Sequence, residues 1–198
     1  MKDDNFFKLN FFEIFNIPQE YNLDKKALEN KLNDLQKQYH LDSSNSLEQK
    51  FLIEMRSSRV NIAYQTLNSD LKRAIYLMNL WYKIDIEDES TLFYDKKIIQ
   101  EILDIQSNLY DIKFEFKGSS NFKNNQTSNS QNPNFEDAFE ANYRFTQEID
   151  KIKSKIYTLE TKISQSLVKN ISSNQIISEL KSDIIRLKFL EDAINKFK

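Results

Sequence analysis

The sequence contains no cysteine, one glycine, two prolines and one histidine among its 198 residues. Without cysteine, the chain can form neither a disulfide nor a thiolate metal site. Sandwiches, barrels and Rossmann domains need many tight turns, and those turns usually draw on glycine. The scarcity of glycine, in a chain rich in Lys, Glu, Leu and Ile, therefore predicts an all-α protein with long helices and short loops.

The charge is almost balanced, and long apolar runs are missing. There are 28 basic and 30 acidic residues, a net charge of −2, which favours neither a nucleic-acid partner nor an anionic membrane. No stretch reaches the ~20 apolar residues of a membrane-spanning helix. The first residues, MKDDNFFKLNFF, include acids and lack the apolar region of a signal peptide. We therefore expect a cytoplasmic protein with no nucleic-acid or membrane partner.

The sequence offers no group of residues typical of a catalytic or metal site. It has no glycine-rich phosphate loop and no histidine pair. Its many carboxylates fall opposite the apolar stripes of amphipathic helices, where charged residues normally form a solvated face. A lone histidine can act as a general base, but His40 falls in a polar segment with no cleft implied around it. We therefore expect a protein that is not an enzyme and holds no cofactor.

Apolar spacing predicts four helices in the first 84 residues. The first, over 11–15, ends before Pro18, because the residue before a proline avoids the α region. The second runs from about 24 to 39, with Asp24 suited to its N-cap, and the third runs from about 47 to 67. Ser69 can cap the fourth helix. The residues of the third helix that we expect to face the core are Phe51, Met55, Ile62, Ala63 and Leu67.

A loop is predicted between the second and third helices. The segment from His40 to Asn45 is polar and turn-prone, and it interrupts the apolar stripe of the second helix. Ser46 to Gln49 then fits a capping box, in which the serine accepts a hydrogen bond from the Gln49 backbone and the glutamine side chain reaches back. The only histidine of the chain is therefore expected in a loop.

The second half of the chain predicts three antiparallel helices that pack as a bundle. We place a linker at the acid-rich residues 85–91, between a first domain at 1–84 and a second at 92–198. The Asn/Ser-rich residues 117–134 form an insert that we expect to be disordered. The three apolar stripes begin at Ile98, Ile149 and Leu180 and end at Phe116, Leu167 and Phe197.

Two aromatic residues of this bundle lie away from its apolar stripes. Around their helices, Phe189 lies about 160° from Leu187, and Phe93 about 140° from the Ile98 stripe. Such residues either pack against another part of the chain or form a partner surface, because exposed aromatics often anchor interfaces.

Segments along most of the chain resemble the HscB family of J-domain co-chaperones for iron–sulfur cluster assembly. They are NFFEIFNIPQEYNLDKKALENKLNDLQKQYHLD, NIAYQTL with KRAIYL, and RLKFLED. The resemblance implies a J-domain at 1–84, a helical hairpin with short flanking helices, joined in an L shape to a three-helix bundle at 92–198. It also implies a co-chaperone that brings an iron–sulfur scaffold protein (IscU type) to a DnaK-class (HscA-type) chaperone and stimulates the chaperone's ATPase.

The resemblance further implies two sets of site residues. The family contacts the chaperone through a His-Pro-Asp tripeptide, whose ends match His40 and Asp42, and through the preceding helix. The implied chaperone-binding residues are His40, Leu41, Asp42, Lys25, Lys26, Lys31 and Lys37. The implied scaffold-binding residues are Phe93, Tyr94, Lys97, Ile98, Glu101 and Phe189.

The tripeptide departs from the family pattern, because Leu41 stands in place of proline and Ser43 in place of a basic residue. Losing a loop proline typically costs about 0.4–1 kcal/mol of preorganisation, which corresponds to a roughly two- to five-fold loss of affinity. The proline also fixes the angle between His40 and Asp42, so its loss could silence stimulation. An alternative function is therefore a scaffold-binding adaptor whose degenerate J-domain no longer stimulates ATP hydrolysis.

Overall fold

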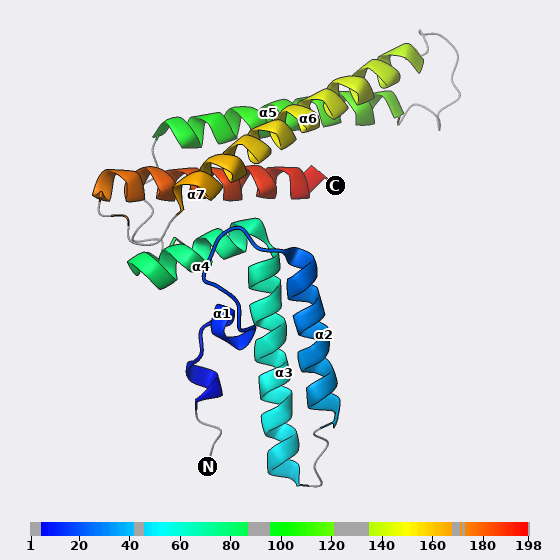
Figure 1. Ribbon diagram of the computed structural model, residues 1–198. Coiled ribbons are helices and arrows are strands. Elements are labelled where there is room, and N and C mark those ends of the chain that lie inside the picture. Colours follow the sequence, from blue (N-terminus) through cyan, green and yellow to red (C-terminus); the bar gives the residue numbers. More distant parts are fainter. Residues whose placement is uncertain are drawn as a thin grey trace. The chain divides into compact units, whose positions relative to one another are not determined.

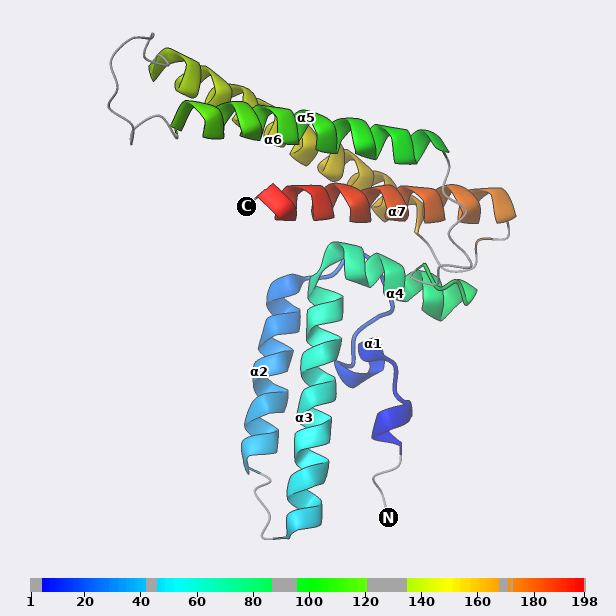
Figure 2. The same cartoon turned by 180° about the vertical axis from the view of Figure 1, so that it is seen from behind.

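The computed structural model describes residues 5–41, 46–86, 96–120, 135–167, 171 and 173–197, and all of its regular elements within these ranges are helices (Figures 1 and 2). The predicted all-α fold is thus confirmed. In chain order the elements are η1 (Phe6–Lys8), α1 (Phe11–Ile14), α2 (Lys25–Leu41), α3 (Leu47–Asn68), α4 (Asp70–Tyr82), α5 (Lys96–Ser120), α6 (Phe135–Ser166) and α7 (Asn174–Phe197).

The chain divides into two compact units. Unit 1 comprises residues 1–91 and 163–177, and unit 2 comprises residues 92–162 and 178–198. Helix α5 continues to Ser120, so the first four residues of the segment expected to be disordered are helical. The rest of that segment, 121–134, lies outside the described residues.

Unit 1 is built on the antiparallel hairpin of α2 and α3, with α1 and α4 packed against α3 (Figure 1). Its fully buried side chains include Phe12, Leu28, Leu67, Leu77 and Met78. Burying such a side chain contributes roughly 1.5–3 kcal/mol relative to leaving it in water. These residues come from all four helices of the unit, so one core holds them together.

Side-chain caps fix where the helices of unit 1 begin. The Asp24 carboxylate accepts hydrogen bonds from the N–H groups of Lys26 and Ala27, at 2.9 and 3.0 Å. The Ser69 hydroxyl accepts from the Lys72 N–H at 3.3 Å. These contacts satisfy N–H groups that have no partner within a helix. The sequence predicted both caps, and both are confirmed.

The scarcity of glycine does not prevent left-handed helix ends. Helix α4 ends at Tyr82 and is capped by Lys83, which has φ 57° and donates its N–H to the Asn79 carbonyl at 3.0 Å. Asn16, after α1, has φ 48°. Glycine usually fills such positions, and asparagine is one of the few other residues that adopt them readily.

The tight connection between α3 and α4 is organised by Arg73, whose side chain is buried. Its Nε donates to the Tyr21 carbonyl at 2.5 Å. The rest of the guanidinium donates to the Leu67 carbonyl and the Asp70 carboxylate, and it lies over the Tyr21 ring at 5.0 Å. One cation therefore ties the end of α3, the start of α4 and the loop before α2 together.

The apolar residues of α3 lie on two different faces of the helix. Ala63 and Leu67 are fully buried, as predicted. Phe51, Met55 and Ile62 are 63%, 43% and 53% exposed, so the prediction that they face the core was wrong. Successive residues turn by about 100°, which places the centre of these three about 120° around the helix from the centre of Ala63 and Leu67. Apolar spacing alone did not show which of the two faces the core covers.

Unit 2 contains α5, most of α6 and most of α7. Their predicted apolar stripes are largely buried and form the core of the bundle. Ion pairs join the helices above this core, because Lys155 of α6 lies 3.0 Å and Arg186 of α7 lies 3.2 Å from the two carboxylate oxygens of Glu101 on α5. The most completely buried stripe residues are Ile98, Leu109, Ile152, Leu180, Ile184, Leu187 and Leu190.

Candidate functional site

The end of α2 carries the histidine that the resemblance implicates. The helix continues to Leu41, so His40 and Leu41 belong to its last turn, and the prediction that a loop begins at His40 was wrong. A proline at position 41 would disfavour the α conformation at His40, whereas leucine is a good helix former. The helix therefore continues through both residues. Asp42 and the residues up to Asn45 lie outside the described part of the chain.

The start of α3 fixes the other end of this turn. The Ser46 hydroxyl accepts a hydrogen bond from the Gln49 N–H at 3.2 Å, which confirms the serine half of the predicted capping box. Helix α3 begins at Leu47. Helix α2 thus ends at Leu41 and α3 begins at Leu47, and Asp42 falls between the two helices in the sequence.

Two of the four lysines implicated in chaperone binding are engaged within unit 1. The Lys25 Nζ lies 2.5 Å from the Asp70 carboxylate at the start of α4. The Lys31 Nζ donates to the carbonyls of Phe15 and Asn16 at 3.0 and 2.8 Å, just after α1. Lys31 thus satisfies carbonyls that follow a helix C-terminus, where a positive charge is favourable. Both side chains hold the fold of unit 1.

The other two lysines point outward. Lys26 is exposed at the start of α2. The Lys37 side chain is 75% exposed and lies 3.8 Å from Asp34, itself 77% exposed. Such surface pairs contribute little to stability. These two residues are therefore the lysines of the predicted set that are best placed to meet a partner.

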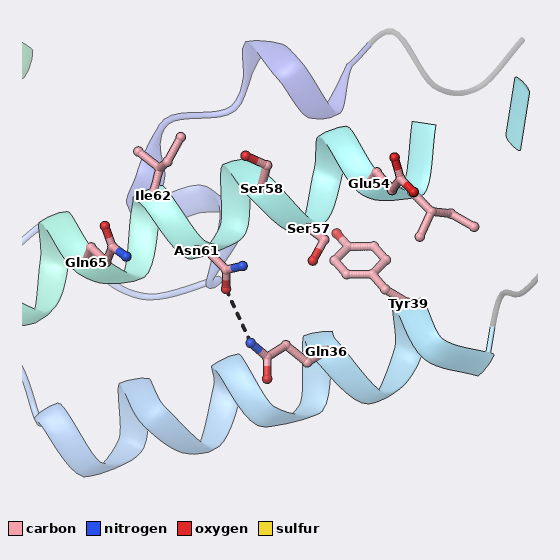
Figure 3. A pocket seen from close by; sticks show the side chains of 9 residues that line it. Gln36, Tyr39, Glu54, Ser57, Ser58, Asn61, Ile62 and Gln65 are labelled. Carbon is pink, nitrogen blue, oxygen red and sulfur yellow. Dashed lines mark hydrogen bonds between the residues drawn. The ribbon is translucent and has the colours of Figure 1, made fainter. Parts of the chain in front are cut away.

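A groove of about 700 Å³ runs between α2 and α3, near the turn (Figure 3). The Gln36 amide donates to the Asn61 side-chain oxygen across it at 3.3 Å. Tyr39 points into it from α2. The lining mixes amides, hydroxyls and short apolar surfaces. The remaining lining residues are Ile53, Glu54, Ser57, Ser58, Ile62 and Gln65.

The predicted scaffold-binding residues are distributed between core and surface. Ile98 is 2% exposed, so its side chain faces the core of unit 2. Lys97 is exposed, Phe189 is partly buried, and Glu101 is held by Lys155 and Arg186. Phe93 and Tyr94 lie outside the described residues. The structure thus brings Lys97 and Glu101 together on one face of α5, one turn apart.

Helix α5 also has an exposed apolar stripe that the sequence analysis missed. Ile99, Leu103, Tyr110 and Phe114 are 37%, 53%, 56% and 80% exposed. Their spacing of four, seven and four residues repeats the periodicity of the core stripe, offset by one residue from Ile98. A search for a second apolar stripe on the same helix would have found them.

The described residues give no sign of a metal centre or a membrane span. Within the described ranges, no three His, Cys, Asp or Glu side chains gather closely enough to hold a metal ion. None of the helices in those ranges combines the length and the apolar character needed to span a bilayer.

Comparisons with known proteins identify the fold. No known family model matches the sequence. Chaperone HscB from Vibrio cholerae is 19% identical, with a TM-score of 0.65, over 95% of this chain and 94% of that one. The human co-chaperone protein HscB is 18% identical, with a TM-score of 0.69, over 95% of this chain and 80% of that one. The chain therefore has the fold of the HscB co-chaperones, as the sequence resemblance implied.

Proposed function

We propose that this protein is a J-domain co-chaperone for iron–sulfur cluster assembly, which binds a scaffold protein of the IscU type and delivers it to a DnaK-class (HscA-type) chaperone. One observation carries the proposal. The chain has the HscB fold over 95% of its length. The position of its only histidine, at the end of α2, agrees with this role. In this role the protein regulates the partner's ATPase and is not itself an enzyme.

The chaperone contact is proposed to lie at the end of the hairpin that contains α2. Asp42 would form a salt bridge with a chaperone arginine, because carboxylate–guanidinium pairs are strong and directional. His40 would supply the second contact of the tripeptide. Lys26 and Lys37 are exposed and would meet an acidic surface of the chaperone. Lys25 and Lys31 would support this surface from within, since both are engaged in unit 1.

The scaffold contact is proposed on unit 2, at the start of α5 and on α7. The partner would meet Phe93, Tyr94, Lys97, Glu101 and Phe189. Ile98 is buried, and we propose that it supports this surface from the core. The pairing of Glu101 with Lys155 and Arg186 fixes the carboxylate, which favours a contact of defined geometry.

A second candidate function is an adaptor that binds the scaffold protein without stimulating the chaperone. The observation that favours it is the continuation of α2 through Leu41. Proline at this position would end the helix earlier and change how His40 is presented. The two functions share the fold and the scaffold contact, and they differ only in the ATPase.

Single-turnover ATP hydrolysis by the cognate chaperone separates the two functions. Under the first, the protein accelerates hydrolysis, and Asp42→Asn returns the rate to the basal value. Asp34→Asn is the matched control, because it removes the same charge from an exposed position of α2, and it should retain the acceleration. Under the second, the unmodified protein gives the basal rate and Leu41→Pro restores acceleration. A basal rate with both the unmodified protein and Asp42→Asn contradicts the first function. If the unmodified protein also fails to bind the scaffold protein, the second function is contradicted as well.

A further inference from the structure

The Glu101 carboxylate of α5 lies between two cations of unit 2. The Lys155 Nζ of α6 is 3.0 Å from one of its oxygens, and the Arg186 Nε of α7 is 3.2 Å from the other. The three side chains are 32%, 50% and 33% exposed, so water and a partner can reach all of them. Because one carboxylate faces two cations, the group keeps one surplus positive charge.

These three residues also line a pocket of about 310 Å³ on unit 2. Among its described lining residues they are the charged ones, and the others are Ser154, Thr158, Leu159 and Leu190. The two hydroxyls of the lining already donate to backbone carbonyls one turn earlier in α6. The donors that the pocket offers to a ligand are therefore those of Lys155 and Arg186.

Arg186 has hydrogen-bond donors that the described part of the chain does not use. A guanidinium carries five N–H groups in a planar fork. Within the described residues, the partner of this guanidinium is Glu101 alone. The buried Nε lacks an aligned hydrogen bond even to that carboxylate, although the two groups are 3.2 Å apart. The fork therefore keeps donors for a second acceptor.

We propose that this pocket binds the carboxylate of an Asp or Glu side chain of the scaffold protein, and that Lys155 and Arg186 select for that charge. The inference rests on the proposed function, because it names the chemistry of the partner at the scaffold contact proposed above. Glu101 belongs to that contact, and Phe189 follows Arg186 by three residues on the same face of α7. The pocket is therefore continuous with the proposed contact.

The surplus charge decides which group of the partner fits the pocket. One carboxylate balances one positive charge, whereas a phosphate group carries nearly two negative charges. A lysine or arginine of the partner would approach two cations and one carboxylate, so it would be repelled. In this arrangement Glu101 orients the two cations and does not accept a cation of the partner.

Calorimetric titration of the scaffold protein into the full chain tests the two cations. Arg186→Gln should weaken binding by about fivefold or more, and Lys155→Gln by a smaller factor, because arginine can hold a carboxylate with two parallel hydrogen bonds. Lys153→Gln is the control. It removes the same charge from a 61% exposed side chain of α6, about 160° around the helix from Lys155, and it should leave the affinity unchanged. If Arg186→Gln binds as tightly as Lys153→Gln, the inference is overturned.

The charge at Glu101 reveals the sign of the partner's group. Glu101→Gln should tighten scaffold binding, because the partner's carboxylate then no longer competes with Glu101 for the two cations. If the scaffold protein instead presented a cation to Glu101, the same substitution would weaken binding and Arg186→Gln would tighten it. That pair of results overturns the inference. Circular dichroism would confirm that each variant folds.

A measurement without the scaffold protein separates this inference from the proposed function. The NMR signal of the Arg186 Nε–H, assigned by its loss in Arg186→Lys, should shift when sodium acetate is added to the full chain. Sodium chloride at the same ionic strength should shift it much less. Equal responses to the two salts overturn the carboxylate pocket. A response specific to acetate, in a chain that does not bind the scaffold protein, supports the pocket and contradicts the proposed function.

Discussion

The two units are held together in different ways. In unit 1, buried or partly buried cations donate to backbone carbonyls of loops and helix ends, as Arg73 does to Tyr21 and Leu67, Arg59 to Leu9, and Lys31 to Phe15 after α1. In unit 2, repeating apolar stripes fill the core and the ion pairs stand above it.

Hydrogen bonds from cations thus hold the loops of unit 1 in place, whereas apolar packing holds the helices of unit 2 together. A carbonyl that loses its buried donor stays desolvated and unpaired, which is costly. An ion pair at the surface returns its groups to water when it breaks, at little cost. Cations in unit 1 are therefore expected to matter far more for stability than cations of the same type in unit 2.

The largest expected effect is that of Arg73→Leu. The substitution should lower the free energy of unfolding of unit 1 by about 3–5 kcal/mol, because it leaves two buried carbonyls unsatisfied and breaks a partly buried ion pair with Asp70. Trp81, the only tryptophan of the chain, lies in α4 and reports unfolding of unit 1 in urea.

Arg186→Leu is the matched variant in unit 2. It removes one partner of Glu101, but Lys155 remains and the Arg186 side chain is 33% exposed. Unfolding followed by circular dichroism should show a loss below about 1 kcal/mol. Equal losses for the two arginines would contradict the difference between the units.

The same difference explains what the sequence could predict. The stripes of unit 2 and the caps at Asp24, Ser46 and Ser69 are local patterns, and the structure confirms them. The carbonyl partners of Lys31 and Arg59 lie 15 to 50 residues away in the sequence. No local pattern shows such a contact. The family resemblance alone therefore placed Lys31 among the residues expected to meet a partner protein.

The end of α2 at His40 and Leu41 shows a second reason why prediction from the sequence failed. Its polar character predicted a loop, but the helix-forming tendency of Leu41 and the absence of a proline extended α2 by two residues beyond the predicted end. The outward apolar face of α3 was missed because both of its faces carry apolar residues, and spacing cannot tell which one is buried.

A smaller effect is expected for Lys31→Met, which removes the donor for the carbonyls of Phe15 and Asn16. Unit 1 should lose about 1–2 kcal/mol, since the lysine is partly exposed and water can replace part of each contact. Lys26→Met, which removes an exposed lysine of the same helix, should change stability by less than about 0.5 kcal/mol. If Lys26→Met is as destabilising as Lys31→Met, the assignment of Lys31 as a structural contact is wrong.

A further modest effect is a pH dependence from Asp70. Burial alone would raise the pKa of this carboxyl, but hydrogen bonds and charges from Lys25 and Arg73 outweigh burial and lower its pKa below the usual value. A carboxyl whose pKa is lower in the folded state stabilises that state fully above its unfolded pKa of about 3.9, and the contribution disappears as pH falls through the folded pKa. In urea unfolding followed by Trp81 fluorescence, Asp70→Asn should therefore be less stable than the unmodified protein by about 1 kcal/mol at neutral pH. The difference should begin to shrink once the pH drops below 4 and should disappear as the pH falls through the lowered folded pKa, because the Asp70 carboxyl is then protonated and, like the asparagine amide, uncharged. A difference that stays constant down to pH 2.5 would mean that the amide disturbs the packing around Arg73, and that the Asp70 charge contributes nothing to unit 1.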